Sequence, residues 1–70
     1  MTAKEIFESA GYQLIYKHDD QYVYENTDYQ TRIHISKLGI YKTHISDKSM
    51  CVLRVCEMNA VYHQLKEMEE

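Results

Sequence analysis

The shortness of its turns limits the fold of this chain more than any other feature. Between residue 12 and residue 45, stretches rich in Tyr, Ile and Val alternate with polar interruptions of only three or four residues. Successive parallel strands need a connection of a dozen residues or more, whereas antiparallel strands can be joined by a tight turn. The chain is therefore expected to form an antiparallel meander, in which each strand pairs with the next.

The expected strands occupy residues 12–17, 22–25, 29–36 and 40–45. The third shows the clearest alternation, with one face of Tyr29, Thr31, Ile33 and Ile35 and an opposite face of Gln30, Arg32, His34 and Ser36. Such alternation is typical of a strand with one buried face. A short apolar segment at residues 50–53 is the candidate for a fifth strand.

A short helix is expected before the strands. Thr2 and Glu5 stand in the capping-box arrangement, in which two end donors of a helix are satisfied reciprocally. Gly11 supplies the left-handed residue that ends such a helix. The apolar residues between them follow helical spacing and form one stripe: Ala3, Ile6, Phe7 and Ala10.

A second helix is expected from residue 54 or 55 to residue 69. Apolar residues at helical spacing predict its buried stripe, which comprises Val55, Met58, Val61, Tyr62, Leu65 and Met68. The solvent side is predicted to hold Glu57, Asn59, Gln64, Lys66 and Glu67.

Seventy residues suffice for one domain and not for two, so residues 1–70 are expected to form a single domain. Its fold class is α+β: a two-layer domain with a helix at each end, four or five antiparallel strands, and both helices on one face of the sheet. The other face is expected to be open. The predicted core comprises Ile6, Phe7, Ala10, Leu14, Val23, Ile33, Ile35, Leu53, Met58, Val61, Tyr62 and Leu65.

The segments TAKEIFESAGYQLI and CEMNAVYHQLKEM carry a family resemblance. Their matching residues are Thr2, Ala3, Phe7, Gly11, Tyr12 and Leu14 at the start, and Glu57, Met58, Ala60, Val61, Gln64, Leu65 and Glu67 at the end. With these residues the chain resembles small proteins of phages and prophages of Gram-positive bacteria. It departs from their pattern at Arg54, where a threonine cap is usual, and it lacks their Leu-Gly-Trp ending. The resemblance implies a helix–strands–helix fold and an accessory role in a bacterial cytoplasm, and it implies no catalytic residue.

Neither catalysis nor metal binding is indicated. Four His and two Cys are present, but none forms a CxxC, HxxxH or HExxH unit of the kind that presents adjacent ligands to zinc. Cys56 lies near a helix start, and His63 is two turns away from it, too far to serve as its base. We therefore expect no enzyme activity, no metal and no cofactor. The N-terminus has no signal-peptide pattern and no apolar run is long enough to span a membrane, so we expect a cytoplasmic protein with reduced thiols.

The surface offers two hypotheses for function. Tyr and Met are enriched at protein interfaces, and seven Tyr and four Met favour a protein-interaction module with a host or phage protein partner, or a homodimer. Alternatively, residues 30–54 carry five cations against one carboxylate, a net +4 in a chain of net −3. A basic sheet face with tyrosines is suited to single-stranded nucleic acid. The candidate partner-binding residues are Tyr24, Arg32, Tyr41 and Lys42.

Overall fold

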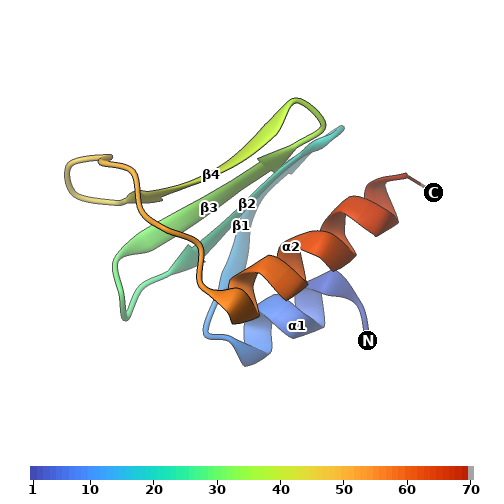
Figure 1. Cartoon of the computed structure of the whole chain (residues 1–70), viewed down its shortest axis with the longest axis horizontal. Helices are drawn as coiled ribbons and strands as arrows, with labels where there is room; N and C mark the ends of the chain where they lie inside the picture. The colour runs from blue at the N-terminus through green and yellow to red at the C-terminus, as the bar shows by residue number, and fades with distance from the viewer. Residues whose placement is uncertain (70) are drawn as a thin grey trace.

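The computed structural model describes residues 1–69 and confirms the α+β meander (Figure 1). The sheet has strand order β1-β2-β3-β4 with every neighbouring pair antiparallel, and both helices lie on the same face of it (Figure 1). The elements are α1 (Ala3–Ser9), β1 (Gln13–His18), β2 (Gln21–Asn26), β3 (Thr31–Ser36), β4 (Gly39–His44) and α2 (Val55–Met68).

The strand bounds differ from the expected ones by one or two residues. β3 begins at Thr31 because Gln30 has a φ of 56° and belongs to the preceding turn. The segment after β4 turns back along it, and Cys51 donates its backbone N–H to the Lys42 carbonyl at 2.8 Å. This contact remains a single bridge between Thr43 and Met50, so no fifth strand forms in the part of the chain that is described.

The two signals predicted from the sequence, the capping box and Gly11, mark the start and the end of α1. Thr2 Oγ1 accepts from the Glu5 backbone N–H at 3.2 Å, and Glu5 Oε1 accepts from the Thr2 backbone N–H at 2.8 Å, which completes the capping box. Gly11 follows the helix with a φ of 92°, and a Cβ there would stand 3.1 Å from the Asn26 side chain. Because glycine has no Cβ, the chain can turn sharply here from α1 into β1 while it lies close to Asn26 of β2.

An aromatic cluster forms the centre of the core. Phe7 stacks on Tyr24 with ring centroids 3.8 Å apart, and it meets Tyr12 edge-on at 5.8 Å. Ile33 lies next to Tyr24 across the β2–β3 pair. The fully buried members are Phe7, Tyr12, Tyr24, Ile33, Ile35 and Ala60, with Val61 almost as buried.

Three predicted core residues lie elsewhere. Met58 and Tyr62 are 54% and 57% exposed, and Val23 is only half-buried because it lies on the sheet face away from the helices. Tyr12 and Tyr24 take up the core volume in their place. The other nine predicted core residues are buried or pack against the core.

The orientation of α2 corrects the prediction most strongly. Its buried residues are Glu57, Ala60, Val61 and Gln64, of which two were expected on the solvent side. Only part of the expected apolar stripe faces the core: Val61 is buried and Leu65 and Met68 pack against it. Val55, in contrast, is 83% exposed. The physical reason is that side chains inside the core form hydrogen bonds with Glu57 and Gln64.

Candidate functional site

Glu57 fixes α2 through a buried polar network. Lys42 Nζ lies 2.9 Å from Glu57 Oε1, and the Tyr12 hydroxyl donates to Oε2 at 2.6 Å. Arg54 adds its backbone N–H and its side-chain Nε, each 2.9 Å from a carboxylate oxygen. Because every lone-pair region of this carboxylate has a donor, burying the charge does not leave it unpaired.

Gln64 makes a second anchor two turns along α2. Its Oε1 accepts from the Tyr24 hydroxyl at 2.6 Å inside the core. Burial raises the pKa of Tyr24, and it raises the pKa of Tyr12 to about 12, so both phenols stay protonated and keep donating. The two tyrosines therefore bind the polar residues of α2 and draw that face of the helix inward.

The Glu57 network makes the stability of the fold dependent on pH in the acid range. Burial opposes ionisation, but hydrogen bonds from Tyr12, Arg54 and Lys42 outweigh it and lower the pKa of Glu57 from 4.5 to about 2. A lowered folded-state pKa stabilises the protein above the unfolded pKa, and this stability is lost as pH falls through the folded one. The melting temperature should therefore fall as the pH is lowered from about 4.5 to about 2.

The matched variant is Glu57→Gln, which keeps the shape and cannot ionise. Its melting temperature is expected to be lower at neutral pH and to change less across this acid range. Exposed Glu5 and Asp47, whose pKa values are also lowered by hydrogen bonds, leave a residual slope. An unchanged pH profile in Glu57→Gln would contradict the assignment.

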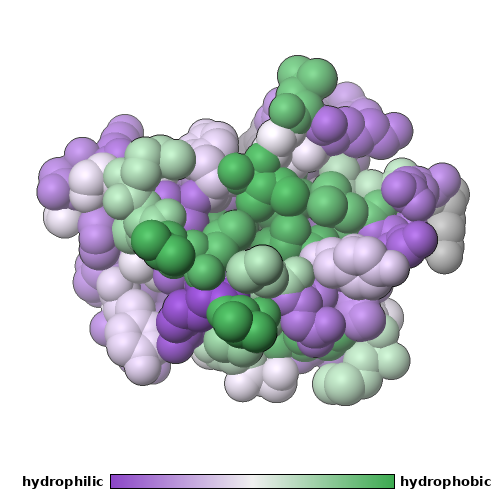
Figure 2. Space-filling view, viewed as in Figure 1, coloured by the Kyte–Doolittle hydropathy of each residue, from purple (hydrophilic) through white to green (hydrophobic). Residues whose placement is uncertain are grey.

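The orientation of α2 leaves large apolar side chains on the surface. We call Val52, Val55, Met58 and Tyr62 the α2 stripe; their exposed fractions are 85, 83, 54 and 57%. The three that belong to the helix stand at i, i+3 and i+7, so a repeat of 3.6 residues per turn places them on one side. Figure 2 shows hydrophobic residues gathered in a band on the face that carries β4 and α2. Ile40, Leu53 and Leu65 are partly buried and pack against the core.

The sheet separates the four predicted partner-binding residues into two pairs. Tyr24 and Lys42 lie on the covered face, 1% and 7% exposed, because both are in register with Ile33. Arg32 and Tyr41 lie on the open face. The expected single exposed site of these four side chains does not form, since neighbouring positions on a strand point to opposite faces.

The basic segment is largely neutralised by ion pairs. Of its five cations, only Lys48 has no carboxylate partner among the described residues. Arg54 also lies over the ring of Tyr29, with its guanidinium 5.0 Å from the ring centroid. The pairs are Arg32–Glu25, Lys37–Asp20, Lys42–Glu57 and Arg54–Glu57, with nitrogen–oxygen distances of 3.0, 3.6, 2.9 and 2.9 Å.

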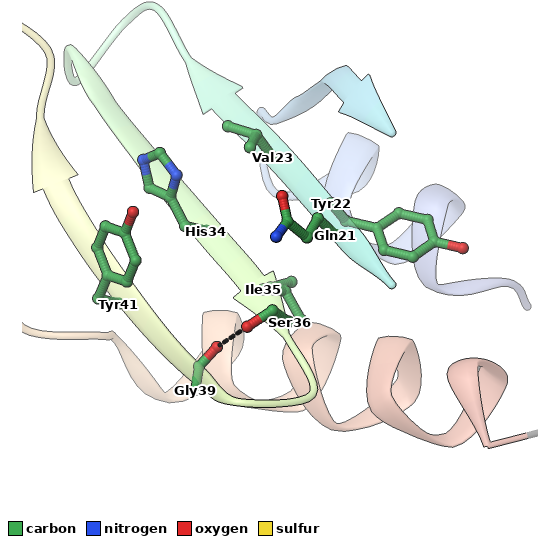
Figure 3. Close-up of a pocket in the computed structure, with 8 residues that line it drawn as sticks. All are labelled: Gln21, Tyr22, Val23, His34, Ile35, Ser36, Gly39 and Tyr41. Atoms are coloured by element: carbon green, nitrogen blue, oxygen red, sulfur yellow. Dashed lines mark hydrogen bonds between the residues drawn. The ribbon is translucent and has the colours of Figure 1, made fainter. Parts of the chain in front are cut away.

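The open sheet face carries a stacked pair of rings. His34 on β3 and Tyr41 on β4 are directly opposite in register, with ring centroids 4.4 Å apart and planes within 7° (Figure 3). A hollow of about 140 Å³ lies on the side of Val23 and Gln21 (Figure 3). A second hollow, of about 370 Å³, lies toward Lys48. The sequence alternation had placed His34 on this face, but its pairing with Tyr41 depends on the β3–β4 register.

Other chemistry gains no support from the geometry. Within residues 1–69 no three His, Cys, Asp or Glu side chains converge as metal ligands would. Cys51 and Cys56 are free thiols. No helix in the described part of the chain is long and apolar enough to cross a membrane.

Comparison of the chain with models of protein families, with curated proteins and with solved structures finds no match. Function must therefore be argued from the two exposed surfaces, the α2 stripe and the open sheet face.

Proposed function

We propose that this chain is a non-catalytic protein-interaction module that inserts the α2 stripe into an apolar groove of another protein. The observation that carries the proposal is the orientation of α2, which buries a glutamate and a glutamine and exposes Val55, Met58 and Tyr62. Burying apolar surface stabilises a fold by about 25 cal/mol per Å², whereas a buried charge must be fully compensated. Burial of apolar area alone would favour the opposite orientation; the polar network holds the observed one and leaves an apolar surface exposed, and departures of this kind are expected at functional sites.

The spacing of the exposed residues indicates how the helix would be recognised. Anchors at i, i+3 and i+7 are the pattern by which an amphipathic helix lies in a hydrophobic groove. Lys66 lies beside the stripe, with its Nζ 5.7 Å from the Tyr62 ring centroid and no ion pair to any described carboxylate. The groove is therefore expected to carry an acidic residue on its rim.

The size of the stripe favours a different protein over a second copy. From Val55 to Tyr62 the helix rises only about 10 Å. A standard interface needs about 800 Å² and 20–30 residues from each partner. Two flat copies of this surface would bury too little, whereas a groove surrounds the helix and supplies the missing area.

The setting of this interaction is part of the proposal. The resemblance of the two chain ends to small phage and prophage proteins supports an accessory role in a bacterial cytoplasm. The alternative of single-stranded nucleic-acid binding through a broad basic face is disfavoured, because Lys37, Lys42 and Arg54 are held in ion pairs and Arg32 gives its Nε to Glu25. A net charge of −3 disfavours it further.

Neighbouring lysine substitutions on α2 test the proposal. Met58→Lys places a charge in the stripe, and Asn59→Lys places the same charge on the adjacent exposed side of the helix. A partner captured from nuclease-treated host lysate should bind Asn59→Lys as it binds the parent. It should bind Met58→Lys at least about tenfold more weakly, a loss of about 1.4 kcal/mol.

Calorimetry with the purified partner measures this difference, and light scattering reports self-association. Equal binding of both variants would overturn the proposal. The proposal would also be overturned if only a second copy of the chain bound the stripe, or if a partner were captured only when the nuclease was omitted.

A further inference from the structure

Independently of α2, the geometry points to a ligand site on the open sheet face: we propose that the hollow beside Tyr41 and Lys48 binds a flat aromatic ring that carries a phosphate. We call it the β4 hollow. It has a volume of about 370 Å³ and lies between the outer face of β3–β4 and the segment that follows β4. Small-ligand sites range from about 300 to 1,000 Å³, so this hollow has room for one nucleotide-sized ligand.

The ring-binding part is the stacked pair on the sheet. Tyr41 lies almost parallel to His34 and is still 46% exposed, so its ring retains surface on which another flat group can stack. Burial, together with nearby Arg32, lowers the pKa of His34, so the imidazole at the base of the stack is uncharged at neutral pH. An uncharged aromatic platform of two rings is a suitable surface for a nucleobase, because every base has a π face.

The phosphate-binding part comes from the cations of the same hollow. Lys48 makes no ion pair with a described carboxylate, and exposed His44 lines the wall near it. Arg32 contacts Glu25 through Nε only, so its terminal N–H groups have no hydrogen-bond partner among the described residues. Paired N–H donors of this kind match phosphate oxygens.

No carboxylate lines the β4 hollow to compete with an anion. The nearest in sequence, Asp47, accepts from the Ser49 backbone N–H at 3.0 Å and from the Ser49 hydroxyl at 2.8 Å. It therefore shapes the loop that carries Lys48. The ring platform lies at one hollow with Lys48 and the terminal N–H groups of Arg32. This combination distinguishes the site from the smaller hollow near Val23, whose lining has no Lys or Arg.

Titrations followed by amide NMR test the site with adenosine monophosphate as the probe, alongside adenosine and inorganic phosphate. The monophosphate should shift amides of β3, β4 and residues 48–50, with a dissociation constant at or below the millimolar range. Adenosine and phosphate alone should each bind about tenfold more weakly or worse. No shift with the monophosphate, or equal shifts with phosphate alone, would overturn the proposal.

Variants show whether the named residues bind the probe. Tyr41→Ala and Lys48→Ala should each weaken binding about fivefold to tenfold. Tyr41→Phe, which keeps the ring, should bind as the parent does and guards against a general disturbance of the sheet. The control pair is Tyr62→Ala and Lys66→Ala, since these residues form a similar ring–cation contact on α2. Binding that survives both substitutions in the hollow would contradict the assignment.

A short adenine oligonucleotide separates the two sources of this ligand chemistry. Tighter binding of the strand than of the mononucleotide, with the same shifted amides, would assign the hollow to a nucleotide within a single strand. Equal or weaker binding would assign it to a free nucleotide. Both outcomes leave the proposal for the α2 stripe unaffected, because that surface lies on a different element.

Discussion

Replacing Glu57 with leucine is expected to abolish cooperative unfolding at room temperature. The change leaves Lys42 buried without a counter-charge, since its Nζ lies 2.9 Å from the lost carboxylate and only the Val52 carbonyl, at 3.4 Å, remains. It also removes the acceptor of the Tyr12 hydroxyl and of the Arg54 backbone N–H. Removing one partner of a buried pair costs about 3–5 kcal/mol. A core of this size rarely supplies more than about 3–5 kcal/mol in total.

The double variant Lys42→Met with Glu57→Leu is the control. With both charges gone, an apolar pair of similar volume fills the site, and replacements of this kind are often neutral or stabilising. Circular dichroism during urea unfolding should show a cooperative transition in the double variant and none in Glu57→Leu. Lys42→Met alone should be intermediate, because Tyr12 and Arg54 still hold the carboxylate. Purely additive losses would show that the two residues do not interact.

Phe7→Ala is expected to destabilise the domain by about 3–5 kcal/mol, the usual cost of truncating a buried aromatic residue. Phe7 is fully buried and contacts both tyrosines that bind α2. The cavity therefore loosens the hydroxyls of Tyr12 and Tyr24 as well as the apolar core.

The matched control is Met58→Ala, a large-to-small change at an exposed position of α2. It should alter the free energy of unfolding by less than about 0.5 kcal/mol, the usual range for surface changes. Urea unfolding of the two variants measures the contrast. A similar loss in both would mean that Met58 is packed in the core, as its place in the apolar pattern had predicted.

The parts of the fold that were predicted correctly follow from local rules. The capping box of Thr2 and Glu5 acts over three residues, and turns of two to four residues leave antiparallel pairing as the only choice. Strand bounds shifted where a turn residue such as Gln30 adopts a positive φ, which the sequence pattern does not display.

The orientation of α2 was missed because it depends on residues far away in the sequence. Glu57 is buried by Lys42, fifteen residues earlier, and by Tyr12, forty-five residues earlier. A pattern of apolar spacing assigns both Glu57 and Gln64 to solvent. One signal was present: strand alternation places Lys42 on the same face as Ile40, so a lysine was due to meet the helix layer. The same alternation separates Tyr24 and Lys42 from Arg32 and Tyr41.

The most direct test of the central claim, that the α2 stripe is the partner-binding surface, is site-specific photo-crosslinking in cells that produce the protein. A photoreactive residue at Met58 is compared with one at Asn59, the next residue along α2 and likewise exposed. The structure predicts a discrete crosslink to one other protein from position 58 and none from position 59. The same crosslink from both positions, or none from position 58 while position 59 reacts, would contradict the proposed role of the stripe.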